Sequence, residues 1–100
     1  MTPRLRFRAR ARAEVLEARD WYDARSPGLG LEFARTVDAA LALVQRMPDA
    51  FKPLRGDVRQ VVLRRFPYTI LFAHLKDEMV VLTVHHDRQA PTRWHRARDA

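Results

Sequence analysis

The chain has 100 residues, 47% of them hydrophobic, which suits one domain with a buried core over residues 1–100 and excludes a disordered protein. Its formal net charge is +7, and all 19 basic residues except Lys52 and Lys76 are arginines, which favours either nucleic acid or an acidic protein segment as the partner. The absence of cysteine excludes disulfides and thiolate metal sites.

Residues 4–10 alternate strictly between arginine and apolar side chains. This period of two predicts a strand with Leu5, Phe7 and Ala9 on the buried face and the arginines outside. The arginines form either a ligand-binding stripe or a charged edge that discourages aggregation. The segment lacks the apolar stretch of a signal peptide, and no run approaches the roughly 18 apolar residues of a membrane span. We therefore expect a cytoplasmic protein with no membrane partner.

Two helices are predicted next, over residues 11–25 and 29–47. The first has apolar residues at helical spacing, widened by two more: Ala11, Val15, Ala18 and Tyr22, with Leu16 and Trp21. The second has an apolar stripe of the same kind, made of Phe33, Val37, Ala40, Val44 and Met47 and broadened by Ala34 and Leu41. Ser26-Pro27-Gly28 separates them, and so short a break favours an antiparallel helical hairpin.

Residues 58–94 organise the rest of the chain, after a loop over residues 49–57 that Phe51 and Leu54 are expected to fix in place. Three apolar runs, broken by Phe66-Pro67 and by residues 76–78, predict a three-stranded antiparallel meander. In its last strand, simple alternation puts Val80, Leu82 and Val84 on one face and Val81 and Thr83 on the other.

Both faces of this sheet are largely apolar, and one helical hairpin covers only one of them. The other face must be met by the C-terminal tail, by long side chains of the sheet itself, or by a partner. The predicted fold class is α+β, in the order β-α-α-β-β-β, with the two-helix hairpin packed on one face of an antiparallel sheet.

Short motifs along nearly the whole chain resemble those of the RelE/ParE toxin superfamily of type II toxin–antitoxin systems, closer to the ParE-like branch. They are Glu14-Val15-Leu16 with Trp21-Tyr22, residues 26–30 with Phe33, residues 47–51, Val58-Arg59 with residues 63–68, and residues 84–88 with Pro91, Arg93 and Trp94. The resemblance implies a growth-inhibiting toxin neutralised by a small antitoxin, encoded beside it, whose C-terminal segment wraps the toxin. An acidic, amphipathic segment would suit both the apolar surface and the excess of arginine.

RelE-like members cut mRNA on the ribosome, which is the alternative activity here. The RNA 2′-hydroxyl attacks, so the protein must supply a base, an acid and cations at the phosphate. His85 or His86 is the candidate acid, and Arg59, Arg65 and Arg88 are the candidate cations. Adjacent strand residues face opposite sides, so only one histidine can point into a given cleft. No base is evident, because the nearby acidic residues all look like turn or strand-end residues: Asp57, Asp77, Glu78 and Asp87.

ParE-like members instead act by binding, and the implied target is DNA gyrase. The candidate contacts are the cationic side chains around the end of the sheet and one tryptophan: Arg64, Arg65, Arg88, Arg93, Trp94 and Arg96. Trp94 is either an exposed anchor or a core residue folded back on the sheet. We favour binding and leave enzymatic activity open. A nucleic-acid-binding module or a degenerate, non-toxic member are further readings. No cofactor is expected, and the four histidines lack metal-ligand spacing.

Overall fold

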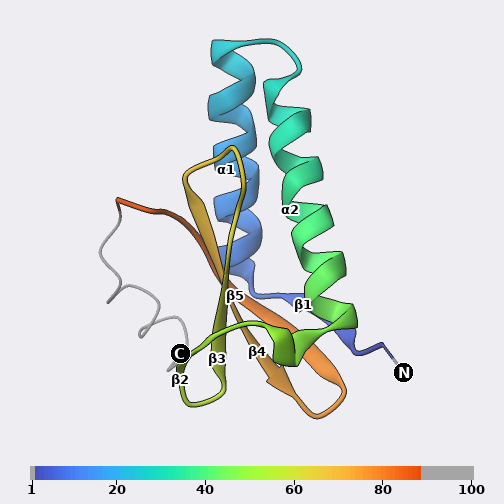
Figure 1. Cartoon of the computed structure of the whole chain (residues 1–100). Helices are drawn as coiled ribbons and strands as arrows, with labels where there is room; N and C mark the ends of the chain where they lie inside the picture. Colours follow the sequence, from blue (N-terminus) through green and yellow to red (C-terminus); the bar gives the residue numbers. More distant parts are fainter. Residues whose placement is uncertain (1, 89–100) are drawn as a thin grey trace.

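The computed structural model describes residues 2–88; residue 1 and residues 89–100 are outside that description. Its elements are β1 (Arg4–Phe7), α1 (Ala9–Arg25), α2 (Leu29–Arg46), the 3-10 turn η1 (Pro48–Ala50), β2 (Pro53–Arg55), β3 (Val58–Val62), β4 (Tyr68–Leu75) and β5 (Glu78–His86). Figure 1 shows the helices as a hairpin beside a twisted sheet. The predicted α+β class, with the helical hairpin on one face, is confirmed.

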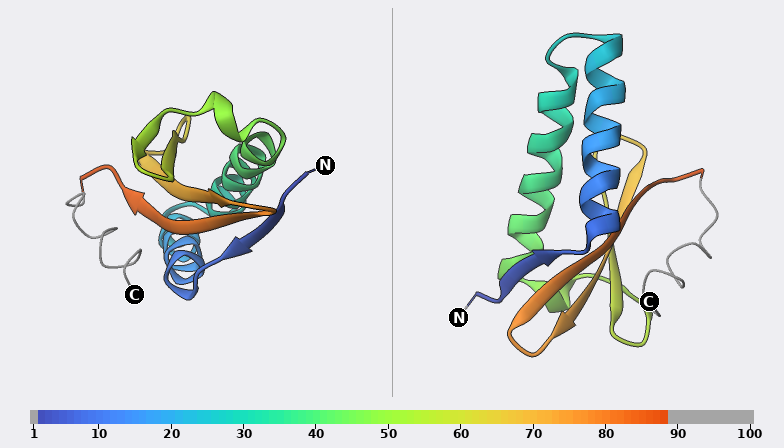
Figure 2. Two further views of the ribbon diagram at one scale, coloured as in Figure 1. Left: turned by 90° about the horizontal axis from the view of Figure 1, so that it is seen from below. Right: turned by 180° about the vertical axis from the view of Figure 1, so that it is seen from behind.

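The sheet is mixed, not wholly antiparallel, and its strand order is β1-β5-β4-β3-β2. β1 lies parallel to β5, with Arg4 opposite Glu78 and Phe7 opposite Val81, whereas the β3–β4 and β4–β5 pairs are antiparallel, as predicted for the meander. A parallel pair needs a long crossover connection, and the elements from α1 to β4 provide it between β1 and β5. The views in Figure 2 show β1 beside β5 at the edge of the sheet.

The helices end close to the predicted positions, and their junction explains why they pack so tightly. Asp23 Oδ1 accepts hydrogen bonds from the backbone N–H groups of Gly28 (2.9 Å) and Gly30 (3.2 Å), which satisfies the start of α2. Gly28 has φ +90°, which favours glycine, and a Cβ at Gly30 would lie 2.4 Å from the carbonyl oxygen of Arg19. Glycine at position 30 therefore allows the close approach of the two helices.

One core lies between the helical hairpin and the sheet. α2 contributes its predicted stripe, with Phe33, Val37 and Val44 at most 1% exposed, and the sheet contributes Ile70 and Phe72. Two predicted additions to the α1 face are wrong, since Leu16 and Trp21 are 42% and 51% exposed. Leu16 lies on the exposed side of α1, and Trp21 lies at the edge of the contact between α1 and the sheet.

A β-bulge in β5 changes which side chains join that core. Leu71 pairs with Thr83 and Phe72 pairs with Val81, so Leu82 is an extra residue on β5. As a result Val81 and Val84 both belong to the helix-side core, together with Met79. The predicted grouping of Val84 with Val80 and Leu82 is therefore wrong, because simple alternation is interrupted at the bulge.

The opposite face of the sheet has a small cluster of its own. Its members are all at most 5% exposed: Val58, Leu71, Ala73, Val80 and Leu82. A cavity of about 250 Å³ adjoins them and is bordered by the long side chains of Arg6 and Arg8 and by Asp57. This face is buried within the chain, so it does not need a partner to cover it.

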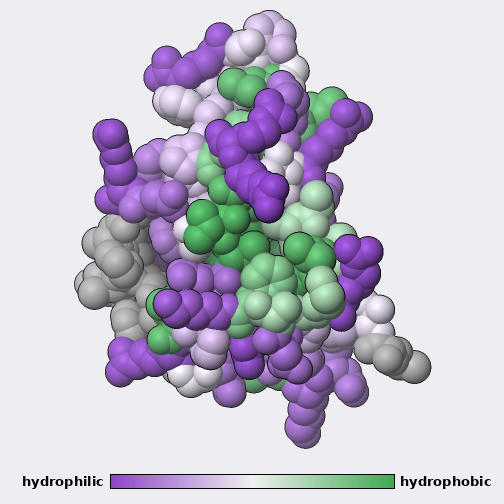
Figure 3. All heavy atoms as spheres, in the orientation of Figure 1, coloured by the Kyte–Doolittle hydropathy of each residue, from purple (hydrophilic) through white to green (hydrophobic). Residues whose placement is uncertain are grey.

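The predicted loop over residues 49–57 contains η1 and the short strand β2, which pairs with β3. Phe51 holds the segment as expected, because its ring packs edge-on against Phe72 at 6.0 Å, but Leu54 is 44% exposed. Figure 3 shows hydrophobic side chains gathered in the middle of one face of the molecule, between hydrophilic ones. No helix within residues 2–88 is long and apolar enough to cross a membrane.

Candidate functional site

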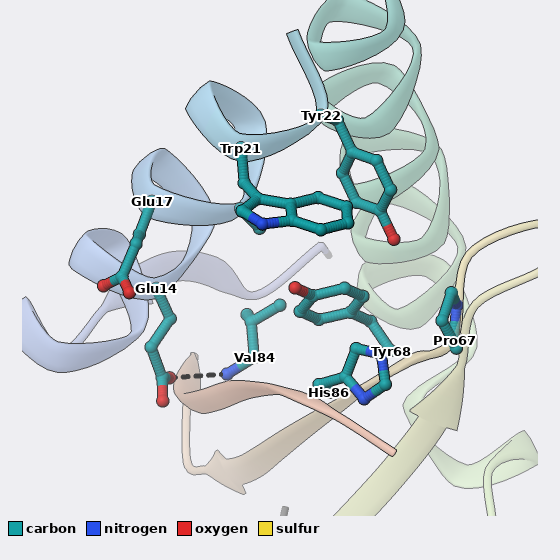
Figure 4. A pocket seen from close by; sticks show the side chains of 9 residues that line it. Glu14, Glu17, Trp21, Tyr22, Pro67, Tyr68, Val84 and His86 are labelled. Atoms are coloured by element: carbon teal, nitrogen blue, oxygen red, sulfur yellow. Dashed lines mark hydrogen bonds between the residues drawn. The ribbon is translucent and has the colours of Figure 1, made fainter. Parts of the chain in front are cut away.

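A cavity of about 520 Å³ lies between α1 and the adjoining ends of β4 and β5. We call it the α1–β5 groove. The residues that line it come from three places along the chain: Glu14, Glu17, Ala18, Trp21 and Tyr22 from α1, Pro67 and Tyr68 from the start of β4, and Val84 and His86 from the end of β5. Figure 4 shows the groove with its side chains. The groove joins segments that are far apart in sequence.

The α1 side of the groove is one face of the helix. Its residues are separated by three, one, three and one positions, which is the spacing that brings side chains together on an α-helix. Ala18 is small and 5% exposed, so the helix lies close to the sheet at that point. Glu14 and Glu17 lie on one side of the groove and the aromatic residues on the other, as Figure 4 shows.

Glu14 supports an incomplete edge of β5. Pairing with β1 ends at Val81, whose carbonyl oxygen accepts the N–H of Arg8 at 3.0 Å. Farther along, the Val84 N–H donates to Glu14 Oε1 at 2.9 Å, and the other carboxylate oxygen lies 3.8 Å from Arg10 Nε. A side-chain oxygen thus takes the place of a neighbouring strand for this partly buried N–H group.

Aromatic rings form the floor and wall of the groove. Tyr22 packs against Phe33 and Phe66 with centroids 5.4 and 5.0 Å away, and lies 6.2 Å from Tyr68, which itself packs edge-on against His86 at 5.2 Å. Burial raises the pKa of Tyr22. Burial also raises the pKa of Tyr68, and Tyr22, Glu17 and Glu14 raise it further. The groove is therefore continuous with the aromatic part of the core.

The two candidate histidines face opposite sides of the sheet, as alternation predicts. His86 is opposite Tyr68 and lines the groove, and its Nδ1 accepts the Arg88 N–H at 3.1 Å. His85 is opposite Thr69 on the other face, with its Nδ1 3.0 Å from Thr83 Oγ1. Of the two histidines, only His86 belongs to the groove.

Two of the three candidate phosphate-binding arginines, Arg59 and Arg65, do not lie at His86. Arg59 donates to the carbonyl oxygen of Phe51 at 2.7 Å and lies 3.7 Å from Asp49, so it holds the segment before β2. Arg65, at a positive φ of 72° in the β3–β4 connection, donates to Glu32 of α2 at 2.9 Å. Both are engaged in structural contacts away from the groove.

Arg64 and Arg88 are exposed. Arg64 lies in the β3–β4 connection and Arg88 just after β5, close in sequence to the paired residues Tyr68 and His86. Arg64, Arg65 and Arg88 therefore lie toward the same end of the sheet. The other predicted target contacts, Arg93, Trp94 and Arg96, lie outside the described residues.

Sequence reasoning did not identify the acidic side of the groove. The bases considered were instead acidic residues near the meander, namely Asp57, Asp77, Glu78 and Asp87. The spacing of Glu14, Glu17, Trp21 and Tyr22 was a usable signal, since it places all four on one helix face. Within residues 2–88, no group of three His, Asp or Glu side chains is arranged to hold a metal ion.

This geometry suits binding better than phosphoryl chemistry. Among the described lining residues the carboxylates Glu14 and Glu17 carry charge at neutral pH, and neither Arg nor Lys lines the groove. These described side chains would repel a phosphate and offer it no cationic clamp.

Comparison with known proteins agrees with the fold and the motifs. Residues 5–91 match the family described as the ParE toxin of the type II toxin–antitoxin system parDE. Curated relatives include Toxin ParE2 from two Mycobacterium tuberculosis strains, CDC 1551 / Oshkosh and ATCC 25618 / H37Rv. Each is 29% identical over 92 residues, which are 91% of this chain and 88% of the relative.

Two solved structures share the fold. One belongs to a chromosomal ParDE system from P. aeruginosa, with a TM-score of 0.74 and 18% identity over 85% of this chain and 96% of the other. The second belongs to the toxin–antitoxin complex RelBE2 from Mycobacterium tuberculosis, with a TM-score of 0.57 and 24% identity over 86% and 99% of the chains. With the family match over most of its length, this chain belongs to the ParE toxin family of type II toxin–antitoxin systems.

Proposed function

We propose that this toxin inhibits growth by binding a protein target, DNA gyrase, and not by cutting RNA. The observation that carries the binding mode is the separation of the ribonuclease candidates. His85 and His86 face opposite sides of the sheet, while Arg59 and Arg65 are engaged with Phe51 and Glu32. General acid–base cleavage needs its acid, base and phosphate-binding cations at one place.

Gyrase as the target follows from the resemblance to ParE-like toxins, and the exposed arginines give it a candidate surface. Arg64, Arg65 and Arg88 lie toward one end of the sheet. Arginine is frequent among the residues that dominate protein interfaces. Reversal of one of these charges should weaken target binding without disturbing the core.

A supercoiling assay with purified gyrase tests this proposal. We expect the toxin to inhibit supercoiling and Arg64→Glu to weaken inhibition at least fivefold, as for a contact worth about 1 kcal/mol or more. Arg55→Glu is the matched control, because Arg55 is an exposed residue of β2 that pairs with Val58, at the opposite end of β3 from Arg64. Unchanged supercoiling at a large excess of wild-type toxin would refute gyrase as the target. New mRNA 5′ ends at codon boundaries after induction would instead establish the ribonuclease.

We also propose that an antitoxin encoded beside this chain holds it inactive. The two similar structures are a ParDE system and a toxin–antitoxin complex, by their own descriptions. On this chain, Leu16 and Trp21 of α1 are exposed apolar side chains, and Arg12 and Arg19 of the same helix are exposed cations. An acidic, amphipathic segment would match both kinds of side chain.

Growth measurements test neutralisation. Induction of the toxin should arrest growth, and co-expression of the neighbouring gene should restore growth and yield a complex on size exclusion. Normal growth with verified, folded toxin would indicate a non-toxic family member. Growth arrest without rescue would exclude the neighbouring gene product as the antitoxin.

A further inference from the structure

The α1–β5 groove has the opposite charge to the rest of the chain. The sequence carries a net charge of +7, yet Glu14 and Glu17 are the charged lining residues among those described. An acidic partner segment that follows the arginines of this protein would meet repulsion at this groove. The groove therefore has its own ligand preference, distinct from that of the surrounding surface.

The shape of the groove suits a flat cation. Figure 4 shows the rings of Trp21 and Tyr68 facing each other across the cavity, with Tyr22 beside them. Aromatic faces attract cations, and a guanidinium is planar and stacks well between rings. Trp21 already binds one in this way, because Arg25 Cζ lies 4.0 Å from its centroid. Arg25 itself is not among the described residues that line the cavity.

Glu17 is the carboxylate that remains for a ligand. Glu14 is committed to the Val84 N–H and to Arg10. Glu17 is exposed, lines the groove, and has no hydrogen bond or ion pair to another residue of the described chain. A carboxylate beside an aromatic slot can accept two N–H groups from one guanidinium.

We infer, building on the proposed neutralisation by an antitoxin, that the α1–β5 groove receives one arginine side chain of the antitoxin segment. The guanidinium stacks between Trp21 and Tyr68 and donates to Glu17. The antitoxin is the occupant because the groove adjoins the exposed Leu16 and Trp21 and the part of the β5 edge that β1 leaves unpaired after Val81. A segment lying along α1 there passes over the groove.

Such a contact would fix the register of the antitoxin. Acidic side chains alone can pair with many of the toxin's arginines, so they define position poorly. One basic side chain in an otherwise acidic segment would match this groove, and an acidic residue at the same place is repelled by Glu17. The groove would then discriminate between cognate and non-cognate antitoxins.

A small probe tests the groove directly. Trp94→Phe leaves Trp21 as the sole tryptophan, and its fluorescence reports titration with N-acetyl-arginine amide. The matched ligand control is N-acetyl-citrulline amide, which has nearly the same shape without charge. We expect the arginine probe to bind about tenfold more tightly, as for a charge-assisted contact with an aromatic face. Equal binding of the two probes, or binding of neither, would overturn the inference.

A pair of toxin variants separates local from general charge effects. Glu17→Gln should reduce binding of the arginine probe about tenfold. Asp20→Asn removes the same charge one turn away on α1, where Asp20 lies 3.3 Å from Arg19 and does not line the groove, and should leave binding unchanged. An equal loss in both variants would show that the probe responds to net charge and not to the groove.

The full antitoxin then identifies the occupant. Each arginine of its toxin-binding segment is replaced by glutamine, and affinity is measured on wild-type toxin and on Glu17→Gln. We expect one replacement to weaken binding about tenfold on wild type and by much less on Glu17→Gln, the sign of direct coupling. Tight antitoxin binding without such coupling would defeat the arginine contact and leave neutralisation intact. Failure of the antitoxin to bind wild-type toxin would defeat both the proposed neutralisation and this occupant.

Discussion

The two faces of the sheet bury their side chains in different ways. The helix face carries rings, including Phe33, Phe66 and Phe72, and its aromatic packing continues through Tyr22 and Tyr68 into the α1–β5 groove. The opposite face carries five small aliphatic side chains beside a cavity of about 250 Å³. The helix face therefore holds the larger buried cluster and also positions the candidate site, whereas the opposite face holds the smaller cluster.

The largest difference between the faces should appear on truncation of the aromatic core. Phe33 is fully buried and packs within 5.0–5.4 Å of the rings of Tyr22, Phe66 and Tyr68. Phe33→Ala should cost about 3–5 kcal/mol of unfolding free energy, measured by urea denaturation. It should also disorder the groove, visible as lost dispersion of the Trp21 and Tyr68 signals in NMR spectra. A loss below 1 kcal/mol would contradict the central role of this cluster.

A pair of leucines compares the two faces with the same chemical change. Leu82 on the opposite face borders the existing cavity, so Leu82→Ala should cost about 2–3 kcal/mol, the lower part of the range for buried leucine. Leu41 in the helix-side core is equally buried and should cost about 4 kcal/mol. Both are read from urea denaturation. Equal losses would mean that the two faces are packed alike.

Two glutamates of the groove should differ in their effect on stability. Glu14→Ala leaves the Val84 N–H without its acceptor and should cost about 1–3 kcal/mol. Glu17→Ala removes an exposed carboxylate without such a bond and should change stability by less than about 0.5 kcal/mol. Thermal unfolding of both variants checks the contrast. A similar loss for both would show that Glu17 has a structural role.

The smallest effect is on stability at alkaline pH. It concerns the helix face, because Tyr22 and Tyr68 both pack against the core there. The pKa of Tyr68 is raised above 10.0, chiefly by burial, so the folded state retains this proton where the unfolded chain begins to release it. The contribution of protonated Tyr68 to the free energy of unfolding is complete below pH 10 and is lost as pH rises through the folded-state pKa. Tyr68→Phe should therefore flatten the fall in melting temperature above pH 10. An unchanged slope would contradict this origin.

The sequence was informative where structure depends on local periodicity. The stripe of Phe33, Val37 and Val44 predicted α2 and its buried face, and Ser26-Pro27-Gly28 predicted the junction of the helices. Alternation also predicted that His85 and His86 face opposite sides. These features depend on residues within a few positions of one another, so a single sequence contains the necessary information.

Features that depend on distant pairing were not predictable in the same way. The parallel pairing of Arg4 with Glu78 depends on how the helical hairpin crosses the sheet. The exposure of Trp21 depends on how far α1 is rotated about its own axis against the sheet. Prediction of the groove required both the strand pairing and the rotation of α1, since the groove brings Glu17 of α1 to Tyr68 of β4.

The bulge at Leu82 determines which side chains in the second half of β5 face the groove. Deletion of Leu82 would remove the bulge and leave Val84 and His86 beneath α1, whereas regular alternation with Leu82 retained would place Thr83 and His85 there. Among related toxins, a strand of equal length without the bulge would thus exchange which imidazole the partner meets, even where every aligned side chain is identical.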